Sequence, residues 1–171
     1  MATWQLGPFD NDDAVEWCAA LEAIAPDRRT ELVRRALDAA VSADHALTAG
    51  EAARAVAAAA TVLQSITGAP VSESAYAPRF LLGRRDIQVS ASLRDLASRA
   101  LDAMLADGSA WRLRWAGDVE EEDALTVIEE LRVDLASTEL RSGPRRCGTD
   151  GLGHLDHRRP DPRVGLHLHR R

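Results

Sequence analysis

The chain has 171 residues, of which 46% are hydrophobic and 28% charged, and these proportions exclude a wholly disordered polypeptide. Its formal net charge of −6 is unevenly divided, because residues 1–140 carry 13 Arg against 24 acidic residues whereas residues 141–171 carry 8 Arg against 3 Asp. An acidic body disfavours binding to nucleic-acid phosphates, and no apolar run approaches the roughly 18 residues that a membrane span needs.

The first two predicted helices cover residues 12–25 and the segment after Pro26, because apolar residues recur there every three or four positions. Asp27 is expected to cap the second helix. The core-facing stripes are Ala14, Trp17, Cys18, Leu21, Ile24 and Ala25, then Leu32, Val33, Ala36, Leu37, Ala40 and Val41. Within the first stripe, Cys18 is interpreted as a small core residue rather than a reactive thiol.

A third helix is predicted over residues 49–67. Thr48 and Glu51 have the spacing of a capping box, in which each side chain binds the backbone N–H of the other residue. Gly68 is expected to end the helix in a left-handed conformation, and Pro70 prevents its continuation. The many alanines in this helix suggest that other helices approach it closely.

Residues 69–90 show no helical period and are interrupted by Pro and Gly, so we expect an irregular segment. Four of its large side chains are expected to pack against the helices: Tyr76, Phe80, Leu81 and Leu82. The next helix is expected to begin at a second capping-box-like pair, Ser92 and Asp95, and to end by Gly108. Its apolar stripe consists of Leu93, Leu96, Ala97, Ala100, Leu101, Met104 and Leu105.

Two further elements complete the predicted body. Residues 111–115 alternate as a strand would, but the stretch is short and lies between helices, so we interpret it as a short helical turn. The last helix is predicted over about residues 119–137, with acids at 120–123 in its first turn, where the helix dipole favours negative charge. Its inward-facing residues are expected to be Leu125, Ile128, Leu131 and Leu135.

These elements predict an all-α fold: a compact bundle of five to six helices over residues 1–140. Residues 141–171 are rich in Gly, Pro, Arg and His without a usable period, and they predict a disordered basic tail. All 21 basic residues of the chain are Arg, which is typical of GC-rich coding sequences. The tail is therefore open to two interpretations, a functional appendage or a frame-shifted extension.

A row of four polar residues, Asp10 to Asp13, precedes the first helix and is open to two interpretations, a metal site and a helix start. A calcium-binding EF-hand loop needs acids at alternate positions, then Gly and a distant Glu, whereas Ala14 and no Gly follow here. Capping explains the whole row. Asp10 or Asn11 would cap the helix, Asp12 and Asp13 would complement its dipole, and Asp10 with Asp13 has capping-box spacing.

Capping leaves the residues around the polar row unexplained. Phe9 precedes the cap and is expected to form a hydrophobic staple with the first turn. Trp4 and Gly7 have no such role. If the stretch does more than start a helix, its candidate binding residues are Trp4, Phe9, Asp10, Asn11, Asp12, Asp13 and Trp17.

Other clusters of potential ligands are weaker. The acids at 120–123 with Glu129 and Glu130 lack the Glu-x-x-His pattern of di-iron bundles and are interpreted as a solvated face. His45 is interpreted as a surface-loop residue, since its neighbour Asp44 does not make a catalytic triad. The tail's Cys147, His154, His157, His167 and His169 are metal ligands by type, but their spacing matches no zinc site. We therefore predict no metal site and no cofactor.

The stretch MATWQLGPFDNDDAVEWCAAL resembles the opening of the bacterial domain of unknown function 4259. The matching residues are Trp4, Gly7, Phe9, Asp10, Asn11, Asp12, Ala14, Trp17 and Leu21. Gln5 stands where the family usually has Gly. The resemblance implies a small helical bacterial protein, and it supplies no activity.

The leading functional hypothesis is a non-enzymatic module that binds another protein, for example an immunity-type protein that masks a basic toxin surface. It rests on the acidic body and on the lack of nucleophile-elbow, P-loop, dinucleotide or zinc-protease patterns. The alternative is a carboxylate-based metal-dependent enzyme or metal binder that uses Asp10, Asp12 and Asp13 with the acids at 120–123. A third hypothesis is weak nucleic-acid contact by the tail. We expect a cytoplasmic location, since the N-terminus does not resemble a signal peptide.

Overall fold

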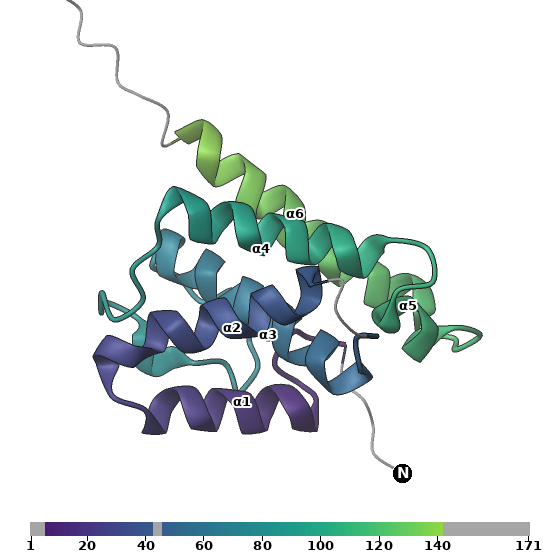
Figure 1. Cartoon of the computed structure of the whole chain (residues 1–171), viewed down its shortest axis with the longest axis horizontal. Coiled ribbons are helices and arrows are strands. Elements are labelled where there is room, and N and C mark those ends of the chain that lie inside the picture. Colours follow the sequence, from purple (N-terminus) through teal and green to yellow (C-terminus); the bar gives the residue numbers. More distant parts are fainter. Residues whose placement is uncertain (1–5, 43–45, 142–171) are drawn as a thin grey trace, which may run out of the picture.

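The computed structural model describes residues 6–42 and 46–141, with side chains through Thr138, and these residues form six α-helices and no strand (Figure 1). The helices are α1 Asp12–Ala23, α2 Arg29–Val41, α3 Ala49–Thr67, α4 Ala91–Leu105, α5 Ala110–Trp115 and α6 Glu121–Arg141, and 3₁₀ turns lie at Pro26–Arg28 and Arg79–Leu81. The predicted all-α fold is confirmed for this part of the chain. The predicted tail lies outside the described residues, with its cysteine and histidines, and so does His45.

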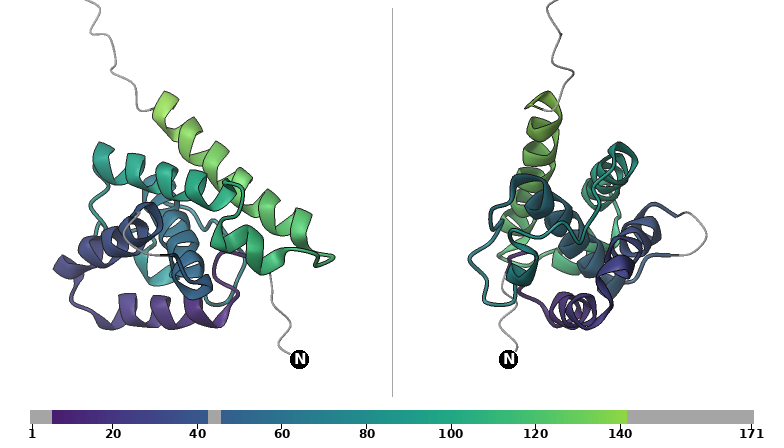
Figure 2. Two further views of the ribbon diagram at one scale, coloured as in Figure 1. Left: turned by 45° about the vertical axis from the view of Figure 1, so that its right-hand side comes forward. Right: turned by 90° about the vertical axis from the view of Figure 1, so that its left-hand side faces the viewer.

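Helix α3 lies at the centre of the bundle. From Ala52 to Gln64 every side chain except that of Arg54 is buried. The helix contacts α1, α2, α4, α5 and α6. In Figures 1 and 2, α1 lies on one side of α3, and α4 and α6 lie on the other. Its alanines leave room for five neighbouring helices, so a helix with little side-chain volume becomes the core of the fold.

The signals predicted for both ends of α3, the apolar stripe predicted for α4 and the helical turn predicted at 111–115 are present. Thr48 N donates to Glu51 Oε2 at 2.8 Å and Glu51 N donates to Thr48 Oγ1 at 3.2 Å, which is the predicted capping box. Gly68 ends α3 with φ +70°. The apolar stripe of α4 faces the core, and residues 110–115 are helical, as interpreted.

Three predictions in the loops are wrong. Asp27 does not cap α2, because the chain enters that helix through the 3₁₀ turn and Arg28 already has helical backbone angles. Ser90 caps α4, not Ser92: Ser90 has the extended backbone of a cap and accepts from Leu93 N at 3.1 Å. Tyr76 is 57% exposed, because it lies in a serine-stabilised turn in which Tyr76 N donates to Ser74 Oγ.

Arg29 is buried at the junction of α1, α2 and the irregular segment. Its Nε donates to Leu21 O at 3.0 Å, and its Nη2 donates to Glu22 O at 2.9 Å, so it binds carbonyls near the end of α1. Its Nη1 pairs with Asp86, and its guanidinium lies 4.9 Å from the centre of the Phe80 ring. One charged side chain therefore joins the end of α1, the start of α2 and a segment more than 50 positions away in the sequence.

Candidate functional site

The polar row begins with a turn and a cap. Asp10 N donates to Gly7 O at 3.1 Å, and a Cβ added to Gly7 would lie 2.0 Å from Asp10 Oδ2. The Asp10 carboxyl therefore lies over the backbone of position 7, and it would have to move if that position carried a side chain. Asn11 is the cap of α1: it is buried, and its Oδ1 accepts from Ala14 N at 2.9 Å. The sequence allows either Asp10 or Asn11 to cap α1, and in the structure the cap is Asn11.

Asp13 does not form the predicted capping box with Asp10, because the cap is Asn11 and Asp13 pairs with another helix. Its Oδ1 accepts from Arg54 Nη2 of α3 at 3.3 Å. A Cβ on Gly50 would lie 2.7 Å from the same oxygen. The first turn of α1 is thus held against the first turns of α3, and the absent side chain of Gly50 makes room for the carboxylate.

A second arginine lies beside this contact. Arg114 Nη1, from α5, donates to Ala49 O at 3.5 Å. Burial lowers the pKa of the Arg114 guanidinium below its usual value, and the Asp13 carboxylate counteracts part of that shift. Asp13, Ala49, Arg114, Trp115 and Asp118 line an open pocket of about 370 Å³. The structure therefore joins the polar row to α5 and to the turn before α6.

The other two acids of the polar row have different surroundings. Asp12 is exposed, and Asp10 is turned toward Gly7. In the pocket that Asp13 shares with Asp118, the guanidinium of Arg114 supplies a positive charge. Within residues 6–42 and 46–141, no group of three or more His, Cys, Asp and Glu side chains is placed to hold a metal ion. The arrangement suits ion pairing between helices better than cation binding.

The aromatic residues of the signature have core positions where they are described. Phe9 is fully buried and Trp17 is 6% exposed, both within the hydrophobic core. Trp4 lies outside the described residues. Cys18 is buried beside them, and burial raises the pKa of its thiol to about 12, so the thiol stays protonated in the folded protein at neutral pH.

Local sequence reasoning missed Arg54, Arg114 and Asp118. Each comes from an element far from the polar row, and nothing in its own neighbourhood distinguishes it from a surface charge. The only available signal is Gly50 in the first turn of α3, where glycine is a poor helix former and therefore indicates a close approach.

A second surface is the outward side of α6, which we call the acidic face. It consists of Glu122, Asp123, Glu129, Glu130 and Val133. All five side chains are exposed, and Val133 is 61% exposed. Arg132, the one basic residue between positions 121 and 138, pairs with Asp102 of α4 at 2.5 Å. Of the six acids predicted to form a solvated surface, the four in this face are exposed, whereas Glu120 and Glu121 are half-buried and Glu121 Oε2 accepts from Gly117 N at 3.0 Å.

The fold and these contacts define a small all-α domain. Its N-terminal signature holds α1 against α3, and α5 lies beside that contact. The chain belongs to the family described as a domain of unknown function (DUF4259), whose model matches residues 2–132. The resemblance seen in the signature is thereby confirmed at the level of the family. No curated protein and no solved structure matches the chain. In the described part of the chain, no helix combines the length and the apolar character needed to cross a membrane.

Replacing Asn11 by Ala is expected to lower the free energy of unfolding by about 1 kcal/mol, because the buried N–H of Ala14 loses its acceptor. Asn11→Asp should keep nearly all of the stability, since a carboxylate oxygen can accept the same hydrogen bond. Urea denaturation of the two variants and of the parent protein measures the difference. Equal losses in both variants would show that the cap does not determine stability here.

Proposed function

We propose that this protein is a protein-binding module, and that the acidic face of α6 recognises a basic surface on its partner. The observation that carries the proposal is the composition of that face: four exposed carboxylates, followed at its C-terminal end by an exposed Val133. Charge complementarity supplies the rate and selectivity of association, and the burial of the apolar Val133 side chain adds binding energy.

The position of the acidic face supports this role. Helix α6 packs against α3 and α4 through its apolar residues Ile128, Leu131 and Leu135, so the opposite side is free to meet a partner without disturbing the core. The helix is anchored by Trp111 of α5, whose Nε1 donates to Ala124 O at 3.2 Å. A rigid helix presents its side chains with little loss of entropy on binding.

A finer version of the proposal is an immunity-type protein that covers a basic toxin. The acidic body, with 13 Arg against 24 acidic residues in positions 1–140, suits a partner of opposite charge. A toxin encoded by the neighbouring gene would support this version.

The metal-dependent alternative has weaker support. It needs the carboxylates of the polar row to converge, whereas Asp13 pairs with Arg54, Asp10 lies over Gly7 and Asp12 is exposed. Calorimetric titration with Mn²⁺ tests it directly. Micromolar binding that is lost in Asp13→Asn would favour the alternative over the protein-binding proposal.

The protein-binding proposal is tested by affinity purification from cells that carry the gene, with two triple variants that remove the same charge. The first neutralises the acidic face, and the second neutralises exposed acids of α1 and α2; they are E122Q/E129Q/E130Q and E16Q/E22Q/E31Q. We expect a basic partner to be retained by the parent protein and by the second variant, and to be lost from the first. Raising the NaCl concentration should release it, because exposed charges are screened.

Two outcomes would contradict the proposal. One is a partner that both variants retain equally, which would place the binding surface elsewhere. The other is the absence of any stoichiometric partner at low salt. Circular dichroism of the variants shows whether they are folded, and surface substitutions of this kind change stability by only about 0.5 kcal/mol.

A further inference from the structure

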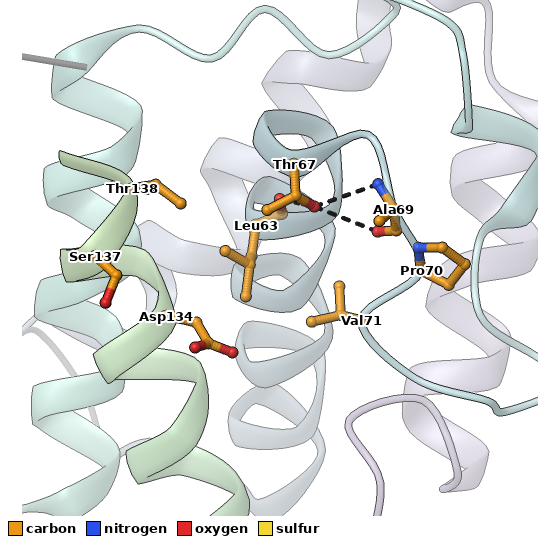
Figure 3. Close-up of a pocket in the computed structure, with 8 residues that line it drawn as sticks. All are labelled: Leu63, Thr67, Ala69, Pro70, Val71, Asp134, Ser137 and Thr138. Carbon is orange, nitrogen blue, oxygen red and sulfur yellow. Dashed lines mark hydrogen bonds between the residues drawn. The ribbon is translucent and has the colours of Figure 1, made fainter. Parts of the chain in front are cut away.

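A pocket lies where the C-terminal parts of α3 and α6 meet (Figure 3). It has a volume of about 320 Å³ and is lined by Leu63, Thr67, Ala69, Pro70, Val71, Asp134, Ser137 and Thr138. Leu63 and Val71 contribute to its apolar surface, and the side chain of Asp134 extends from α6 toward them. Asp134 is the one charged residue among the eight, so the pocket combines an apolar floor with a single carboxylate.

The backbone adds negative potential to this carboxylate. Helix α3 ends at Thr67 beside the pocket, and the lining residues of α6 lie in its last two turns. Carbonyl groups at a helix C-terminus carry partial negative charge and favour a nearby cation. The hydroxyl groups are bound within their own segments: Ser137 Oγ donates to Val133 O at 2.9 Å and Thr67 Oγ1 donates to Leu63 O at 3.1 Å.

We propose that this pocket binds a guanidinium group, and that its occupant is the Arg145–Arg146 pair of the same chain. An arginine fits both features of the pocket, because its methylene stem packs on apolar surface while its charged end pairs with a carboxylate. The chain contains no Lys, so a side chain of this chain that carries a positive charge at neutral pH independently of titration is a guanidinium. The inference goes beyond the proposed function, and Asp134 lies outside the acidic face.

The length of the chain places this pair within reach of the pocket. Helix α6 continues to Arg141, so Arg145 follows the end of the helix by four positions, and an extended chain covers roughly 3.3 Å per residue, or about 13 Å over that stretch. Gly143 and Pro144 lie between them, and these residue types favour reversals of the chain. A short tether holds the arginines at an effective concentration on the order of millimolar, which lets a weak pairing become populated.

The test uses NMR of the full-length protein and two matched variants, R145Q/R146Q and R158Q/R159Q, each of which removes two charges from the tail. The methyl signals of Leu63 and Val71 report on the pocket, and those of Leu21 and Leu37 report on the distant core. We expect R145Q/R146Q alone to shift the pocket signals and to raise amide exchange at residues 134–138 about two- to fivefold, as for a partly exposed ion pair. In an Asp134→Asn background, the same substitutions should shift the pocket signals much less.

Three results would overturn the proposal. Unchanged pocket signals in R145Q/R146Q would mean that Arg145 and Arg146 do not occupy the pocket. This conclusion holds even if an arginine of another protein binds there. Equal shifts in both tail variants would indicate diffuse attraction between tail and body. Equal shifts with and without Asp134 would show that its carboxylate is not the partner. None of these outcomes bears on the acidic face, so they leave the proposed function standing.

Discussion

Replacing Arg29 by Ala should lower the free energy of unfolding by about 3 kcal/mol, among the largest losses that a single substitution can cause in this chain. The substitution leaves Asp86 without its closest cationic partner and leaves two carbonyls near the end of α1 without their donor. It also removes the cation–π contact with Phe80. Urea denaturation followed by tryptophan fluorescence measures the loss.

The neighbouring Arg28 is the matched control. It precedes Arg29 directly, carries the same charge and is exposed, with an ion pair to Asp27 at 3.9 Å. Arg28→Ala is expected to change stability by less than about 0.5 kcal/mol. If both alanine variants lost the same amount, the effect would come from net charge and not from the buried contacts of Arg29.

Replacing Ala58 by Leu in α3 is expected to lower the free energy of unfolding by about 2 kcal/mol, although Leu is as good a helix former as most residues. Ala58 is fully buried, and α3 is covered by neighbouring helices on every side. A larger side chain must therefore push one of those helices away or adopt a strained rotamer. Thermal unfolding followed by circular dichroism measures the change.

The control for this prediction is Ala20→Leu on the exposed side of α1. It adds the same atoms to a helix of the same bundle, where solvent leaves room for them, and its expected effect is near zero. A stabilised Ala58→Leu variant would contradict the packing described for α3, since it would reveal unfilled space around that helix.

A helix boundary can be predicted from the sequence when the residues that determine it lie close to it in the chain. Helix α3 was predictable at both ends because Thr48, Glu51 and Gly68 act on backbone groups within four residues of themselves. The start of α4 was misplaced because Ser90 and Ser92 offer the same hydroxyl, and only the backbone conformation decides between them. Local chemistry thus sets most helix boundaries, and loop geometry sets the remainder.

The candidate site was predictable only in part, for the same reason. The cap at Asn11 depends on a backbone N–H three residues away, and the sequence contains that information. The pairing of Asp13 with Arg54 depends on how α1 crosses α3, over 41 positions of sequence. Such a contact is a property of helix packing, and no short window of the sequence contains both partners.

Two of the helices that contact α3 precede it in the chain and three follow it, and this order has a consequence for synthesis on the ribosome. When residues through Thr67 have emerged, α1 and α2 can already dock on α3. The sides of α3 that later meet α4, α5 and α6 are still uncovered at that stage. A nascent chain that stalls before Ala91 therefore displays apolar surface from the middle of its core, and this is the stage at which it most needs protection from aggregation.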